Sequence, residues 1–200
     1  MMSIEVAELA EAVGSLPMHV DDAANAPPGH PFFGAGFLFI GALLVAETLG
    51  GGVWRRSRLR IMAWPTTLLL AGFGMLVVTY IQPTEKSLHL ALALLLILGG
   101  VIEGRYRLGM VSRTAADTFA IPALVIGGFV IGPMHANGTL LYSAAANTHL
   151  LVGMSGWALA GVKFLRVQRG PTLALDASFA TGVMALGMSL LLVEQFHGAH

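Results

Sequence analysis

The sequence predicts an all-α integral membrane protein with six transmembrane helices, and two observations carry this prediction. Hydrophobic residues make up 56% of the chain and charged residues only 11%, whereas soluble domains carry about 25% charge. Six apolar stretches are also long enough to span a bilayer, because about 20 helical residues cross a hydrocarbon core of about 30 Å. They lie near residues 32–50, 62–81, 87–104, 116–134, 147–165 and 172–195.

The chain before the first span has a different character. Val6, Leu9 and Val13 recur at helical spacing, while Glu5 and Glu8 fall on another face, which predicts a short amphipathic helix lying on the membrane or on a partner. A proline-rich linker follows it. We therefore expect two parts, an outer-side amphipathic segment with its linker over 1–31 and a six-helix transmembrane domain over 32–197.

Basic residues predict the orientation of the spans. They follow spans one, three and five, whereas only Lys86 lies between spans two and three. The basic residues are Arg55, Arg56, Arg58, Arg60, Arg105, Arg107, Arg113, Lys163, Arg166 and Arg169. Because cytoplasmic loops carry an excess of Lys and Arg, we expect both termini to lie on the outer, periplasmic side. The membrane would be a plasma membrane, which in a bacterium is the inner membrane. Trp54 and Trp64 would then form an aromatic belt at the inner interface, with Tyr80 and Tyr142 at the outer one.

A weak internal repeat predicts that the six spans form three antiparallel hairpins. Phe33, His89 and His149 begin the spans that run inward, and an ionisable residue follows each of them by 14 residues. These ionisable residues are Glu47, Glu103 and Lys163. Fourteen residues are close to four helical turns, so each pair shares a helix face.

With this orientation all seven histidines lie on the outer side, which makes a metal site there the leading hypothesis. The candidate ligands are His89, His135, His149 and His197, together with Met134 and Glu194. Imidazole binds copper, zinc and haem iron, and a thioether beside it favours copper. Glu194 and His197 are three residues apart on one helix face, so the carboxylate could bind the metal or orient the imidazole. The alternative is a set of unrelated histidines solvated at the membrane interface.

The same layer offers a haem hypothesis. His89 and His149 would be the two axial ligands of a b-type haem, and Gly153 and Gly156 on one face of span five would let the flat macrocycle approach the backbone. The alternative for these glycines is close helix packing, for which small residues are the usual means in membranes.

Span five also carries a resemblance to a known family. His149-Leu150-Leu151, followed by Trp157 and Ala160-Gly161, resembles a His-Leu-Leu…Trp-x-Gly-Gly helix of the copper-resistance D-type membrane proteins. The resemblance covers one helix of six, and the gap from His to Trp is one residue longer here. It implies a copper role facing the periplasm within a multi-helix bundle.

The remaining ionisable residues of the spans lie within a turn or two of the inner surface. They are Glu47, Glu103, Asp117, Lys163 and Asp176. We expect Glu103 to pair with Arg105 or Arg107, Glu47 to pair with Arg55, and Thr114-x-x-Asp117 to form a helix-capping box. A transporter or channel is disfavoured, because a proton or ion pathway needs a charge near the bilayer midplane.

Two functions from different classes are consistent with these patterns. The first is copper handling, or electron transfer through a b-type haem, at the outer histidine layer, without enzymatic activity. The alternative is a non-catalytic accessory subunit of a larger membrane complex. We expect the lipid bilayer and other membrane subunits or further copies of the chain as partners, and no nucleic acid because the net charge is zero. The absence of Cys excludes thiolate metal sites and disulfides.

Overall fold

The computed structural model describes residues 29–81, 86–134 and 144–197, and these are helical except for three short turns. The helices are α2 (Gly29–Arg55), α3 (Arg58–Ile81), α4 (Lys86–Arg107), α5 (Arg113–Phe129) with a π-helical turn η2 (Val130–Met134), α6 (Ala144–Arg169) and α7 (Leu173–His197). Six of them are long and apolar enough to cross a membrane. The predicted all-helical architecture with six candidate spans is therefore confirmed.

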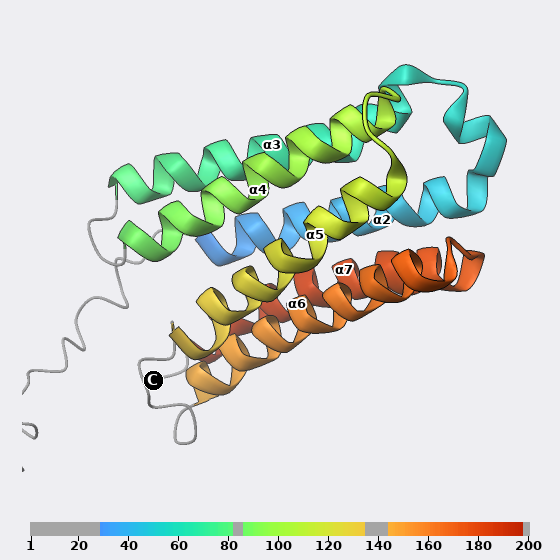
Figure 1. Cartoon of the computed structure of the whole chain (residues 1–200). Helices are drawn as coiled ribbons and strands as arrows, with labels where there is room; N and C mark the ends of the chain where they lie inside the picture. Colours follow the sequence, from blue (N-terminus) through green and yellow to red (C-terminus); the bar gives the residue numbers. More distant parts are fainter. Residues whose placement is uncertain (1–28, 82–85, 135–143, 198–200) are drawn as a thin grey trace, which may run out of the picture.

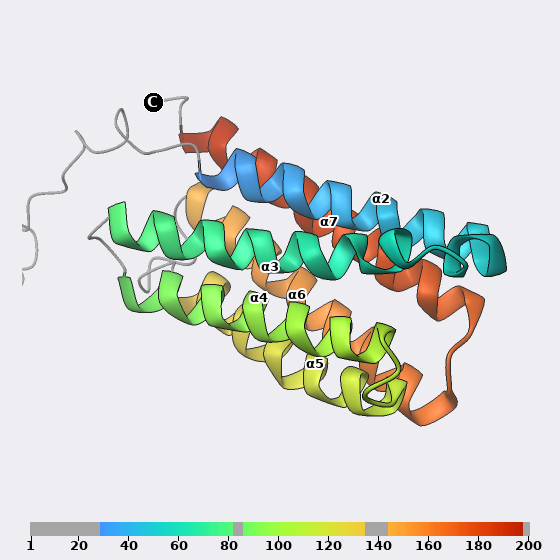
Figure 2. The same cartoon turned by 90° about the horizontal axis from the view of Figure 1, so that it is seen from above.

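The six helices run side by side in alternating directions (Figures 1 and 2). The turns 56–57, 108–112 and 170–172 lie at one end of the bundle, which we call the basic end. The opposite end, where α2 begins and α7 ends, also holds His89 and His149 near the starts of α4 and α6, and we call it the histidine end. His89 and His149 thus lie at the opposite end from the basic turns, while the side chains of the other five histidines lie outside the described residues.

The helices form a closed ring in sequence order. Each helix contacts its neighbours along the chain, and α7 returns to pack along the length of α2. The most extensive contacts join α2 to α7, α3 to α4 and α5 to α6, whereas α2–α3 and α4–α5 share much less. Consecutive helices do contact each other, but the closest partner of every helix lies outside its predicted hairpin, so the grouping into three hairpins is not confirmed.

Glycines allow the closest helix contacts. A Cβ added at Gly153 would lie 2.6 Å from the carbonyl oxygen of Gly128, and one at Gly187 would lie 2.7 Å from the backbone nitrogen of Leu38. The α5–α6 and α2–α7 backbones therefore touch directly. Small residues permit this approach in membranes, where dispersion contacts replace the hydrophobic effect between helices.

Glycines with positive φ accompany the turns at the basic end. Gly51 (φ 47°), Gly109 (φ 75°) and Gly170 (φ 79°) adopt the conformation that other residues rarely take. Gly109 and Gly170 follow the ends of α4 and α6, and Gly51 kinks α2 one turn before its end. All three glycines thus lie near the point where a helix reaches the basic end and the following turn begins.

The outer surface of the bundle is strongly apolar. Large side chains such as Phe39, Leu70 and Phe73 are more than half exposed, while Ile40 and Leu159 are almost fully buried between the helices. A soluble protein rarely exposes so much contiguous apolar surface. A lipid environment accounts for it.

Candidate functional site

Only part of the predicted histidine layer can be located. His89 lies in the first turn of α4, and His149 is buried near the start of α6. His135 lies outside the described residues, as do the side chains of Met134, Glu194 and His197. In the described part of the chain, no three His, Asp or Glu side chains are grouped so that they could hold a metal ion.

The small-residue face of α6 packs against α5. A Cβ at Gly153 would lie 2.6 Å from the Gly128 oxygen, and a Cβ at Gly156 would lie 3.2 Å from the Leu124 oxygen. One turn further, the indole nitrogen of Trp157 donates to the Val125 carbonyl at 3.1 Å. The space that a haem would need beside Gly153 is therefore occupied by α5, so these glycines serve close helix packing, the alternative to the haem hypothesis.

At the basic end, ion pairs form two neighbouring clusters, one on α2 and α4 and one on α5, α6 and α7, and we call the two together the network. On one side, Arg107 of α4 binds Glu47 of α2 and also Glu103, one turn earlier, with 2.7 Å between Nε and Oε1. The expected pair of Glu103 and Arg107 is confirmed. Glu47, however, pairs with Arg107. The side chain of Arg55, its expected partner, lies outside the described part of the chain.

The other side of the network centres on Asp117 of α5. The Lys163 ammonium lies 2.6 Å from Asp117 Oδ1, and both side chains are only 5% exposed. Arg166 Nε lies 3.3 Å from Asp117 Oδ2. Arg113 completes this side by donating from Nη2 to Asp176 of α7 at 2.7 Å.

The predicted capping role of Asp117 is wrong. Helix α5 begins two residues earlier than that motif requires, with Ser112 and not Thr114 as its N-cap and the Ser112 hydroxyl accepting from the Ala115 N–H at 3.1 Å. The serine satisfies the helix end. Asp117 is therefore left to face inward, where it is 3% exposed and meets Lys163 and Arg166.

The network balances four carboxylates with four basic groups. The carboxylates are those of Glu47, Glu103, Asp117 and Asp176, and the basic groups are those of Arg107, Arg113, Lys163 and Arg166. A charge inside a membrane span is costly unless it is paired. Lys163 precedes the last residue of its helix, Arg169, by six residues, which is about 9 Å at 1.5 Å per residue. The pairing therefore matters within the span itself.

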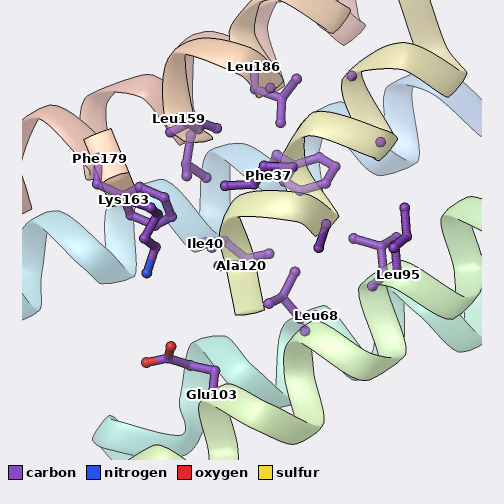
Figure 3. A pocket seen from close by; sticks show the side chains of 18 of the residues that line it. Phe37, Ile40, Leu68, Leu95, Glu103, Ala120, Leu159, Lys163, Phe179 and Leu186 are labelled. Atoms are coloured by element: carbon purple, nitrogen blue, oxygen red, sulfur yellow. The ribbon is translucent and has the colours of Figure 1, made fainter. Parts of the chain in front are cut away.

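An apolar chamber of about 180 Å³ lies inside the ring of helices, next to this network. All six helices line it with side chains that include Phe37, Ile40, Leu68, Leu95, Ala120, Leu159 and Leu186. Figure 3 shows these side chains around the space, with Glu103 and Lys163 at one end and their charged groups directed toward each other. The apolar chamber thus ends on two charges of opposite sign.

A second, polar chamber of about 250 Å³ adjoins it at the basic end. Its walls include most of the ion-pair network, from Glu47 and Arg107 to Arg166 and Asp176. The residues that line both chambers are Leu44, Trp64, Glu103, Lys163 and Phe179, and we call this shared wall the junction. It is the boundary between an apolar and a charged compartment.

Trp64 occupies the junction and not the lipid interface, so its predicted place in an aromatic belt is wrong. It is 7% exposed, and the Arg107 guanidinium lies 5.6 Å from the centre of its ring. Its indole N–H is buried without an acceptor among the described residues. An unsatisfied buried donor costs about 1–3 kcal/mol, and the indole of Trp157 avoids that cost by bonding Val125.

Sequence reasoning identified the charged residues of this site but not the chambers. The repeat placed Glu47, Glu103 and Lys163 at equivalent positions, and the structure brings all three into the network and the polar chamber. A further signal was Ala116, Ala120 and Ala123, small residues recurring on one face of α5 that lines the apolar chamber. Such a stripe leaves space where larger side chains would fill it.

Comparison with protein-family models, with curated proteins and with solved structures finds no match to this chain.

Proposed function

We propose that this membrane protein binds a small amphipathic molecule inside its helical bundle. The apolar part of the molecule occupies the apolar chamber, and its polar head lies at the junction. The observation that carries this proposal is that the apolar chamber ends on the buried charged side chains of Glu103 and Lys163, which also line the neighbouring polar chamber.

The size and lining of the apolar chamber support a ligand. An engineered cavity of about 150 Å³ lined by Leu, Ile and Phe stays dry and binds benzene, and this chamber is of about 180 Å³. Ligand sites combine such apolar walls with a few polar groups that fix orientation. Here Trp64, Glu103 and Lys163 are those groups, and the remaining lining residues are apolar or glycine.

The distribution of charge favours binding over conduction. The ion pairs of the network lie in the half of the bundle near the basic end, and the lining from Leu95 and Gly127 toward the histidine end holds no charged side chain in the described residues. An ion or proton crossing the bundle would need polar or charged side chains along its whole path. A molecule with an apolar body needs none.

Titration calorimetry of the protein in lipid nanodiscs tests the proposal, with 2-octanone as the probe and empty nanodiscs to subtract partitioning into lipid. We expect saturable binding that Ala120→Phe abolishes, because the new ring fills the chamber. Ala158→Phe is the matched control, since Ala158 is exposed on the outer face of α6. If Ala120→Phe does not fold, Ala123→Leu should weaken binding about tenfold. Binding by the wild type that neither filling variant reduces would overturn the proposal.

A second candidate function is the copper or haem role of the histidine end, and the burial of His149 at the same end as His89 favours it. Metal analysis and a visible spectrum of the purified protein test it. Bound copper or a Soret band that His149→Asn removes would support it, and the absence of both iron and copper would count against it. The accessory-subunit hypothesis stays a prediction, and native electrophoresis that finds only a monomer would contradict it.

A further inference from the structure

We infer that the junction selects an uncharged head group with a hydrogen-bond-accepting oxygen, such as the carbonyl of a ketone, quinone, ester or amide. This inference rests on the proposed function and names the ligand class of the same site. Two independent observations carry it, the buried indole N–H of Trp64 and the charge balance of the surrounding network.

Trp64 supplies a donor that the described residues do not use. Its side chain lines both chambers, it is more than nine-tenths buried, and its Nε1 has no hydrogen-bond acceptor there. An indole nitrogen is a donor only. A ligand that satisfies it must therefore present an acceptor, and an ammonium or a hydrocarbon end cannot.

The charges at the junction disfavour an ionised head. Lys163 is paired with Asp117 at 2.6 Å, and Glu103 is paired with Arg107 at 2.7 Å. The wider network balances its four acids with four bases, so an additional carboxylate or ammonium would be an uncompensated buried charge. Such a charge costs far more than a neutral group that is hydrogen-bonded.

The position of these groups explains why the head would stop at the junction. Trp64, Glu103 and Lys163 are the polar residues of the shared wall, and the chamber beyond it toward the histidine end is apolar. A carbonyl oxygen at this wall accepts from the indole, while the attached hydrocarbon stays among Leu and Phe side chains. The molecule is oriented by one donor and by the boundary between two environments.

The test compares octane, 2-octanone, octanoate and octylammonium by calorimetry on the same nanodiscs. A hydrogen bond with a net contribution of about 0.5–1.5 kcal/mol changes the binding affinity about twofold to tenfold. We expect Trp64→Phe to lower the affinity for 2-octanone by that factor and to leave the affinity for octane unchanged. We also expect octanoate and octylammonium to bind more weakly than 2-octanone. Comparing each probe between variants cancels its partitioning into lipid.

Trp157→Phe is the matched control, because that indole already donates to a backbone carbonyl and lies outside the lining of both chambers. In addition, the ¹⁵N-labelled indole signals report the bond directly. The Trp64 N–H proton should move downfield when 2-octanone is added, and the Trp157 signal should not. A merely structural role of Trp64 would not produce this shift.

The outcomes separate this inference from the proposed function. Saturable binding of all probes with no change in Trp64→Phe would overturn the head-group inference and leave the binding proposal in place, as would octanoate binding more tightly than 2-octanone. No saturable binding of any probe would defeat both. Repeating the titration in ether-linked lipid, which lacks ester carbonyls, distinguishes the sources of the acceptor. A higher affinity for 2-octanone in ether-linked lipid identifies the resident molecule as a bilayer lipid, whose ester carbonyl no longer competes. An unchanged affinity identifies the resident molecule as a free compound that is not part of the bilayer. Both outcomes support recognition of the carbonyl.

Discussion

The two ends of the bundle are held together by different interactions. At the basic end, charged side chains such as Lys163 and Asp117 reach between helices and leave a polar chamber between them. Toward the histidine end, glycines such as Gly132, Gly153 and Gly187 bring neighbouring backbones into direct contact. Long side chains span a wider gap than backbone contacts do. One ring of helices can therefore be joined by charged side chains in one part and by direct backbone contacts in another.

The ion-pair network shows residues at similar depth in contact, whereas the histidine layer stays a prediction because most of its candidate ligands lie outside the described residues. Both were sets of residues at similar depth in their spans. The network residues pair across sequence separations of 46 to 63 residues because each also faces the interior, whereas no such grouping of His89 and His149 with a third ligand is found in the described chain. Depth places residues in one layer, but only the rotation of each helix brings them together.

The largest expected effect comes from breaking the buried pair at the basic end. Asp117→Ala should lower the free energy of unfolding by about 3–5 kcal/mol, because it leaves the Lys163 ammonium buried without its carboxylate. Denaturant unfolding of the detergent-solubilised protein measures it. The double variant Asp117→Leu/Lys163→Met should recover most of the loss, since it removes both charges together. A loss below about 1 kcal/mol in Asp117→Ala would show that water or another group satisfies Lys163.

An intermediate effect is expected from disturbing the tightly packed α5–α6 contact. Gly153→Ala should cost about 1–3 kcal/mol, because its new methyl group would lie 2.6 Å from the Gly128 carbonyl oxygen. Gly161→Ala on the same helix is the control, since a Cβ there meets nothing within 4 Å, and its stability should stay equal or rise slightly. Equal stability of the two variants would mean that the close backbone approach is not what holds this contact.

The smallest effect is expected at the rim of the basic end. Arg113 and Asp176 are paired at 2.7 Å, but their side chains remain 27% and 25% exposed. Arg113→Gln should therefore lower stability by only about 0.2–1 kcal/mol, as exposed pairs do, and high salt should reduce the difference further. The same unfolding assay at two salt concentrations measures both. A loss as large as that of Asp117→Ala would place the rim and the centre of the network in one cooperative unit.

The six candidate spans and the gathering of the turn Arg and Lys residues at one end of the bundle could be predicted from the amino-acid sequence, as could a pair of Glu103 with Arg105 or Arg107. These follow from properties of single segments, because hydropathy, loop charge and a four-residue spacing on one helix need no knowledge of neighbours. The internal repeat also placed Glu47, Glu103 and Lys163 in equivalent positions, and all three side chains form ion pairs in the network.

Three features could not be predicted from the sequence: the packing of α7 against α2, the ion pair of Asp117 with Lys163, and the burial of Trp64 at the wall between the two chambers. In a soluble helix, an apolar stripe would indicate the inward face. Here apolar residues cover the lipid-facing side as well, as exposed Leu70 and Phe73 show, so hydropathy cannot fix the rotation of a helix about its axis. That rotation depends on which neighbouring backbones approach and which charges need partners, and both are decided when the ring closes.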